Sequence, residues 1–286
     1  MLGLELYARS RQRFASTSRA THALRPLHLD LRGQTACILV CCIPLLFGFV
    51  IPVGVLLKFV LTGGLVGNVL AIAEVLGGSV LVAGMAALLI TLVSTFIVLA
   101  ATYRGGAALR RMAMAASTGY AVPGTMLAIG VLIFAGSVDR SFAAVTGDGR
   151  ASLLLGGVGI LILAYLVRFQ AVGYGAVLSG IRRLPDNMMG ASRVLGNGFT
   201  SSLRRVILPL LSGSMVAGGL LVFVDVMKEL PMTLLLRPFD FETLATYTYQ
   251  FAKDEMLEEA ALPALMIVIA GLLPVILMNR MLRRTD

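Results

Sequence analysis

Long apolar stretches separated by short polar segments dominate the sequence. A helix needs about 20 mostly apolar residues to cross the hydrocarbon of a bilayer. Six stretches meet this requirement, and they are about Ala36–Val60, Gly78–Ala101, Thr118–Gly136, Ala151–Val167, Val206–Val224 and Ala260–Met278. The pattern predicts an all-α fold, a polytopic transmembrane helix bundle of about six spans, with both termini on one side. Pro123, Pro263 and Pro274 fall inside these stretches, and membrane helices tolerate such prolines.

The composition excludes several classes of protein. Of the 286 residues, 58% are hydrophobic and 14% are charged, and the mean hydropathy is +0.90. A soluble domain has about 45–50% apolar and about 25% charged residues. The chain is therefore an integral membrane protein rather than a soluble domain, a disordered chain or a nucleic-acid-binding protein.

Charges are unevenly distributed between the two sides that six spans define. Most of the 24 Lys and Arg residues, Arg168 among them, fall on the side of the termini, and most of the 15 carboxylates fall on the other side. Because Lys and Arg accumulate in cytoplasmic segments, we expect both termini in the cytoplasm. The net charge of +9 is therefore mainly a topology signal.

The pattern divides the chain into a basic cytoplasmic lead-in, residues 1–35, and a transmembrane domain, residues 36–286. Two connecting segments of this domain are long. One is cytoplasmic, residues 168–205, and the other is external, residues 225–259. Loops of this length usually carry function or have structure of their own.

The cytoplasmic segment contains a short predicted helix. Pro185 and Asp186 are typical of a helix start, and Gly196-Asn197-Gly198 is typical of a helix end. Between them lie the small residues Gly190, Ala191 and Ser192. From about Thr200 a second helix is expected to continue through Leu208 and Pro209 into the fifth span. The short helix either docks into a groove on a partner or packs against its own bundle, and the residues alone leave both open.

The external segment begins with charged residues at a helix end. Asp225, Lys228 and Glu229 have the spacing of neighbours on a helix, so Asp225 and Lys228 are expected to pair at the membrane boundary. With Pro231 and Arg237 they are candidates for an external gate or part of a pathway. A docking surface and a solvated outer loop are the other interpretations.

Several kinds of chemistry have no motif in this chain. There is no phosphate-binding loop and no hydrolase elbow, and both His residues lie in the lead-in. We therefore expect no catalytic residue, no metal site and no cofactor in this chain. Glu242, Tyr247 and Tyr249 are external oxygen donors of the kind that hard cations prefer, but we expect no ion to be held there. Cys37, Cys41 and Cys42 are expected to be packing residues.

The cytoplasmic segment resembles the signature of permeases of binding-protein-dependent ABC importers. That pattern is Glu-Ala-Ala, three residues, Gly, nine residues, Ile, one residue, Leu-Pro. Here Gly190-Ala191-Ser192, Gly196, Val206 and Leu208-Pro209 keep the spacing, with Gly in place of Glu, Ser in place of the second Ala, and Val in place of Ile. The resemblance implies a type I permease whose cytoplasmic coupling helix, around Asp186 to Gly196, contacts a separate ATPase dimer that binds the ATP.

The external segment resembles the ferric-iron-type subgroup of these permeases, which has relatives for thiamine, phosphonates and polyamines. The resemblance rests on Lys228-Glu229-Leu230-Pro231, Thr233-Leu234, Leu236-Arg237-Pro238-Phe239 and Thr243-Leu244-Ala245. It implies the C-terminal half of a double-length permease, with residues 1–35 resembling the linker. It also implies a location in the cell (inner) membrane, a second permease half, an extracytoplasmic substrate-binding protein and ferric iron as substrate.

Two other functions are weighed against this one. A secondary transporter driven by an ion gradient should carry ionisable residues near the membrane midplane, whereas this sequence is expected to keep nearly all charges at the ends of its spans. A membrane enzyme or a scaffold is disfavoured by the absence of catalytic motifs.

Overall fold

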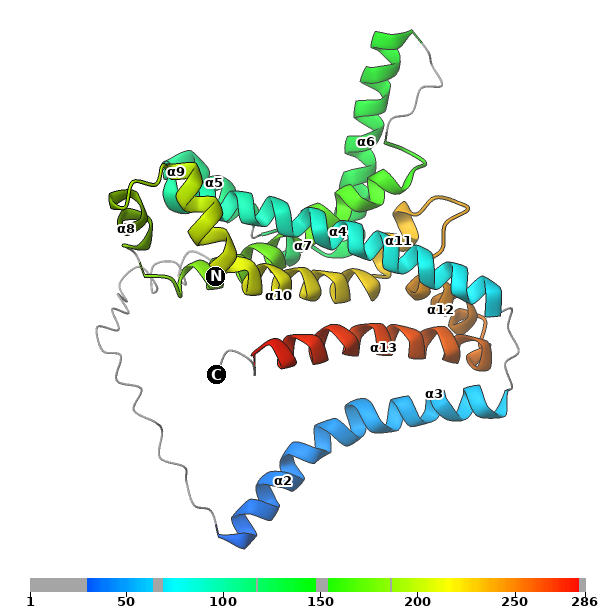
Figure 1. Ribbon diagram of the computed structural model, residues 1–286. Helices are drawn as coiled ribbons and strands as arrows, with labels where there is room; N and C mark the ends of the chain where they lie inside the picture. The colour runs from blue at the N-terminus through cyan, green and yellow to red at the C-terminus, as the bar shows by residue number, and fades with distance from the viewer. Residues whose placement is uncertain (1–29, 64–68, 117, 148–153, 186, 283–286) are drawn as a thin grey trace. The chain divides into compact units, whose positions relative to one another are not determined.

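The computed structural model describes residues 30–63, 69–116, 118–147, 154–185 and 187–282 (Figure 1). The chain divides into two compact units, Met1–Ile51 and Pro52–Asp286. In the first, α2 (Leu31–Leu45) begins at Asp30, whose Oδ1 accepts a hydrogen bond from the Leu31 N–H. It continues into a π-helical turn, η1 (Leu46–Val50).

The second unit contains the remaining helices. In chain order they are α3 (Ile51–Thr62, whose first residue belongs to the first unit), α4 (Val69–Tyr103), α5 (Ala107–Ala116), the 3-10 turn η2 (Gly119–Ala121), α6 (Gly124–Thr146), α7 (Val158–Ile181), α8 (Met188–Val194), α9 (Phe199–Ser202), the π turn η3 (Leu203–Ile207), α10 (Leu208–Met227), α11 (Pro231–Leu236), α12 (Leu244–Lys253) and α13 (Leu257–Leu282).

Both π-helical turns lie just before a proline. The first ends at Val50, before Pro52, and the second ends at Ile207, before Pro209. A proline inside a helix donates no hydrogen bond, and its ring clashes with the carbonyl four residues earlier. A wider turn relieves this clash, so each long helix continues past its proline.

Helices α4, α7 and α10 pack against one another and form the centre of the second unit. Small residues allow α7 and α10 to approach closely, as is common in membrane bundles. A Cβ on Gly180 would lie 2.6 Å from the Ser214 Cβ, and one on Gly218 would lie 2.8 Å from the Ala176 Cβ. Since the contact moves toward the start of α7 as it moves toward the end of α10, the two helices are antiparallel.

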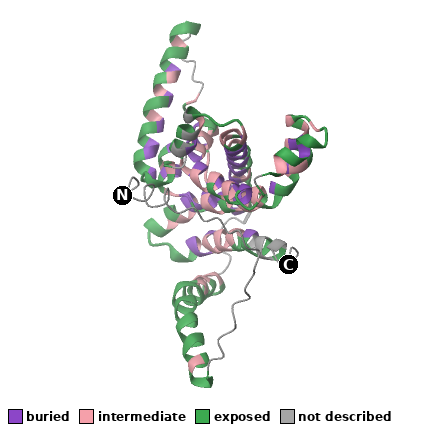
Figure 2. Ribbon diagram, turned by 90° about the vertical axis from the view of Figure 1, so that its left-hand side faces the viewer, coloured by how far each residue is buried: buried purple, intermediate pink, exposed green. Residues whose placement is uncertain are grey.

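Buried side chains form two clusters around these three helices, and the larger cluster also includes residues of α6, α11 and α12. The larger includes Tyr165, Ile90 and Leu244, and the smaller includes Ile181, Ile207 and Leu211. Figure 2 shows the buried residues gathered in the bundle. The helix from Leu31 to Thr62, by contrast, has no buried residue.

The predicted all-α polytopic bundle is confirmed. Six helices of the described residues are long and apolar enough to span a membrane: Leu31–Thr62, Leu70–Tyr103, Gly124–Thr146, Val158–Ile181, Phe199–Met227 and Leu257–Leu277.

Several predicted boundaries differ from those of the helices, and two of them concern Pro123 and Arg168. Pro123 is the N-cap of α6 rather than an interior residue, since its fixed φ suits a helix start. The fourth span does not end at Val167 but continues to Ile181, so the following connection begins there and not at residue 168.

Candidate functional site

The connection between α7 and α9 contains the short helix expected from the sequence. Helix α8 begins after Asn187, and Gly196, two residues past its end, has a φ of +86°. This left-handed backbone favours glycine, which explains why the helix stops there. Asp186, the expected first-turn carboxylate, lies outside the described residues.

Helix α8 has an inner and an outer face. Met188 and Met189 pack against the smaller core cluster, and the buried Ser192 Oγ donates a hydrogen bond to the Ser202 Oγ at 2.9 Å. Gly190 and Ala191 are exposed, and a Cβ added at Gly190 meets no atom within 4 Å. The candidate residues therefore lie on different faces of α8. Ser192 bonds α8 to α9, whereas Gly190 and Ala191 face outward.

Leu208 and Pro209 lie at the start of α10, within the long helix Phe199–Met227. The expected continuation of the second helix into the fifth span is thus confirmed. The hydrogen bond between Ser192 and Ser202 joins α8 directly to this long helix.

At the far end of α10, the expected ion pair is present. The Lys228 Nζ lies 2.9 Å from the Asp225 Oδ1. This hydrogen bond raises the pKa of Lys228 above its usual value, with a smaller opposing effect of burial. The Lys228 side chain is 59% exposed, so the pair lies at the surface.

Glu229 behaves differently from its neighbour. It is buried, and its Oε1 accepts a hydrogen bond from the Met232 N–H at 3.1 Å, at the start of α11. Pro231, the first residue of α11, needs no such partner, since it has no N–H. Glu229 therefore caps α11 with its own side chain.

The Glu229 carboxylate also faces a cation from α7. Its Oε2 lies 3.4 Å from the Arg168 Nε. Arg168 is ten residues past Val158, or about 15 Å along α7 from its first residue. It was assigned to the cytoplasmic side from its sequence position, and that assignment is wrong because Arg168 lies within a span. Arg168 is therefore also an exception to the expectation that nearly all charges lie at the ends of spans.

A second contact joins α7 to α11 one helical turn away from Arg168. The Thr233 hydroxyl donates to the Glu229 carbonyl at 2.7 Å. The Thr233 hydroxyl has one proton, and this bond uses it. The Tyr165 hydroxyl lies 2.6 Å from the Thr233 Oγ1 and is therefore the donor in the bond between them. Tyr165 and Thr233 are both buried.

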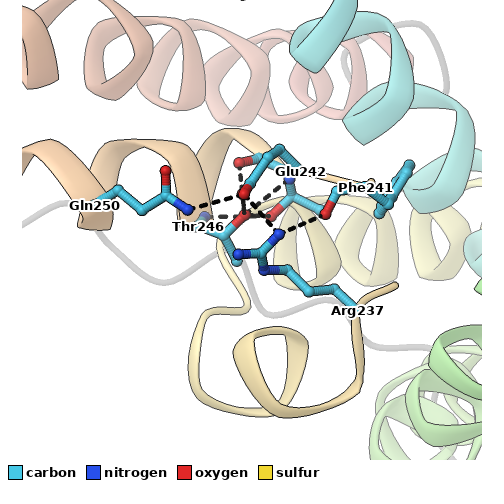
Figure 3. Close-up of polar contacts among 6 residues, drawn as sticks. Arg237, Phe241, Glu242, Thr246 and Gln250 are labelled. Carbon is cyan, nitrogen blue, oxygen red and sulfur yellow. Dashed lines mark hydrogen bonds and ion pairs between the residues drawn. The ribbon is translucent and has the colours of Figure 1, made fainter. Parts of the chain in front are cut away.

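Arg237 joins the two ends of the turn between α11 and α12 (Figure 3). Its Nη1 lies 2.6 Å from the Glu242 Oε1 and donates to the Phe241 carbonyl at 3.0 Å. Glu242 also accepts hydrogen bonds from Thr246 and Gln250. Arg237 therefore stabilises this turn. The Glu242 oxygens that could bind a cation already accept hydrogen bonds or pair with Arg237.

Helix α12 is fixed in turn to α4. Thr243 and Thr246 form a reciprocal capping box at its start, and the Leu244 N–H donates to the Ser79 Oγ at 2.7 Å. No group of three or more His, Cys, Asp or Glu side chains in the described parts of the chain is placed to hold a metal ion.

An apolar cavity of about 740 Å³ lies beside α4, α6 and α7. Val93, Phe134 and Leu163 are among its lining residues. Gln170, also in the lining, donates a hydrogen bond to Ser94 at 2.9 Å. Its mostly apolar walls offer few groups to bind a charged solute.

Sequence reasoning missed the residues that hold the external segment: Tyr165, Arg168, Thr233, Ser79 and Thr246. The one available signal was Arg168, a charge inside a stretch that stays apolar on both sides. A search for a carboxylate partner would then have pointed to Glu229.

Known proteins resemble this chain in fold over most of its length and in sequence over part of it. No protein-family model matches the sequence. It is 28% identical over 121 residues to the Fe(3+)-transport system permease protein FbpB 2 of Haemophilus influenzae, which covers 42% of this chain but only 24% of that protein.

Two solved transporters have similar folds. A bacterial alginate ABC transporter, in complex with an alginate-bound periplasmic protein, matches with a TM-score of 0.65 at 13% identity over 88% of this chain and 94% of the other. The MetNI methionine ABC transporter matches with a TM-score of 0.52 at 17% identity over 76% of this chain and 95% of the other. The chain therefore has the transmembrane fold of these ABC transporters, and its resemblance to the permeases of ABC importers is confirmed.

Proposed function

We propose that the chain is a permease subunit of an ABC importer, which forms part of the pathway for a solute delivered by an extracytoplasmic binding protein. A separate ATPase dimer supplies the energy, and a second permease half, a copy or a different chain, completes the pathway. Both termini lie in the cytoplasm. The match to an ABC transporter over 88% of the chain supports this role.

The observation that carries the proposal is the outer face of α8. Gly190 and Ala191 are exposed, and no atom of the described residues outside α8 lies within 4 Å of a Cβ placed at Gly190. The opposite face of α8 is attached to the bundle by the hydrogen bond of Ser192 and by the packing of Met188 and Met189. A small-residue face on a fastened helix fits a groove on a partner, which we take to be the ATPase subunit.

A size series at Gly190 tests this coupling role. Since the site is open, neither Gly190→Ala nor Gly190→Trp should lower the melting temperature. Gly190→Ala should keep ATP-dependent uptake in vesicles that contain the assembled transporter, whereas Gly190→Trp should lose at least 90% of it. Full uptake by Gly190→Trp would rule out docking at this face.

Ferric iron is the substrate that we propose, with thiamine, phosphonates and polyamines as alternatives. The support is the partial match to an Fe(3+)-transport permease, together with the resemblance of the external segment. A direct comparison of ATP-driven uptake of these four solutes, each with its binding protein, decides between them. Uptake of another solute in preference to iron would refute the assignment.

An ion-coupled secondary transporter is the second candidate, and Arg168 inside a span is the observation that favours it. The two candidates differ in their energy source. Uptake that persists without an ATPase subunit and is abolished by an ionophore would support the second and refute the first.

A further inference from the structure

We propose that Arg168 and Tyr165 of α7 hold α11 as a two-point latch, and that α11 is the gate of the external segment, which must release for a solute to pass. Only the gating role rests on the proposed transport function. The latch itself consists of two contacts between α7 and α11.

The two contacts come from one face of α7. Tyr165 and Arg168 are three residues apart, a spacing that places side chains together on a helix. One reaches the Thr233 Oγ1 at 2.6 Å and the other reaches the Glu229 Oε2 at 3.4 Å. Glu229 and Thr233 are linked to each other through the Glu229 carbonyl. Helix α11 and its cap therefore attach to α7 as a unit.

The space around Arg168 is shaped by glycines. A Cβ on Gly124 would lie 2.5 Å from the Arg168 Nη1 and 3.1 Å from the Glu229 Oε1, and one on Gly119 would lie 2.1 Å from the Val167 carbonyl oxygen. Any other residue at either position would displace the ion pair or the backbone beside it. The turn η2 and the start of α6 thus enclose the pair.

The ion pair between Arg168 and Glu229 is not an efficient way to stabilise the fold. Among the residues that the structure describes, the buried Arg168 Nε has no hydrogen-bond partner, since its approach to Glu229 lacks hydrogen-bonding geometry. Replacing a buried ion pair with apolar residues of similar volume is often neutral or stabilising, so stability alone does not account for it. An attraction that can be broken and remade suits a gate that opens in each transport cycle.

The neighbouring elements are attached to the bundle independently of α11, which itself packs against α6 and α7 and buries Met232 and Leu236. Helix α12 is bonded to α4 through Ser79, and the turn before it is clamped by Arg237. Helix α10 is packed closely along α7. Between these fixed ends, α11 has six residues, and the two α7 contacts are its polar attachments to the bundle.

Cysteine accessibility tests the latch in the full-length chain in membrane vesicles. After Cys37, Cys41 and Cys42 are replaced by Ser, a single cysteine is introduced by Leu236→Cys, at a position that is 4% exposed. Its rate of reaction with a membrane-impermeant maleimide reports how often α11 opens. A cysteine introduced by Leu235→Cys, at a position 46% exposed on the same helix, should react quickly in every variant.

Glu229→Gln keeps the size of the side chain and an acceptor for the Met232 N–H but removes the charge. It should raise the reaction rate of the cysteine at 236 at least tenfold, and Tyr165→Phe should raise it about threefold. Asp240→Asn, the same type of change at an exposed site in the following turn, is the control and should have no effect. A rate for Glu229→Gln within twofold of the parent chain would overturn the latch.

ATP hydrolysis by the assembled transporter tests the gating role separately. Glu229→Gln should raise hydrolysis in the absence of substrate and lower the uptake per ATP consumed. Faster labelling at position 236 together with unchanged uptake per ATP would overturn the gate while leaving the two contacts intact. Transport without any ATPase subunit would instead refute the proposed function and leave the labelling result unaffected.

Discussion

Gly180→Ala should destabilise the chain, because Gly180 lies at the closest contact between α7 and α10. A Cβ there would lie 2.4 Å from the Ser214 Oγ, 2.6 Å from the Ser214 Cβ and 3.1 Å from the Leu211 Cδ2. Rotation of the hydroxyl relieves the first contact but not the second, so the helices must separate. Gly175→Ala is the matched control, since a Cβ at this position on the same helix meets nothing within 4 Å.

The difference between the two variants isolates the packing cost. Replacing glycine with alanine inside a helix gains up to about 1 kcal/mol from helix propensity, and both variants share this gain. Forcing an extra carbon into a packed core costs about 1–3 kcal/mol. At roughly 2–4 °C per kcal/mol for a chain of this size class, Gly180→Ala should melt about 2–12 °C below Gly175→Ala.

The assay must suit the composition of this chain. With no Trp, it offers no tryptophan fluorescence, and its cysteines are exposed, so a thiol-reactive dye would label the folded protein. Loss of helical circular dichroism on heating in detergent avoids both difficulties. Melting temperatures for the two variants that agree within 1 °C would refute the close α7–α10 contact.

Two further predictions concern the external segment. Thr243→Ala removes the acceptor for the Thr246 N–H at the start of α12, so it should cost about 1 kcal/mol, measured as a lower melting temperature by circular dichroism; an unchanged value would contradict the capping box. Because Asp225 raises the pKa of Lys228, the pair stabilises the fold fully below the unfolded Lys pKa of about 10.4 and loses this effect as the pH rises through the higher folded value. The parent chain should therefore melt above Asp225→Asn at pH 8, and the difference should shrink toward pH 11; a gap that widens with pH would contradict the sign.

The number of spans could be predicted from the sequence because hydrophobicity is a local property of each stretch. The helix stop at Gly196 was equally local, since it depends on the backbone freedom of one residue. The ion pair between Asp225 and Lys228 was predictable for the same reason, as its partners are three residues apart. These features need no knowledge of the tertiary fold.

The role of Arg168 could not be predicted in this way. A charge in an apolar stretch normally marks the end of a span, so the fourth span was predicted to stop at Val167. In the structure, Glu229 lies opposite the guanidinium, and the helix continues to Ile181. The partner comes from a distant part of the chain, and only the packing of α7 against α10 brings the two together.

Ser192 shows a similar limit on a smaller scale. The small residues of α8 were grouped as one face, but Ser192 turns inward to Ser202 while Gly190 and Ala191 face outward. A helix of seven residues has too few turns for its pattern to reveal which side packs. The contact with α9, ten residues later, decides it.

The α7–α10 pair connects the two regions that we propose to work together. At one end, Ile181 and Ile207 pack in the cluster that supports α8, and at the other end Arg168 and Glu229 meet beside α11. A pair of closely packed helices moves as one body more readily than it deforms, so a displacement of α8 should be carried to α11. Gly180 is next to Ile181 at the α8 end of this pair, so loosening the contact there should weaken the link. Gly180→Ala should therefore lower the uptake per ATP consumed even at temperatures well below its melting point, whereas Gly175→Ala should not.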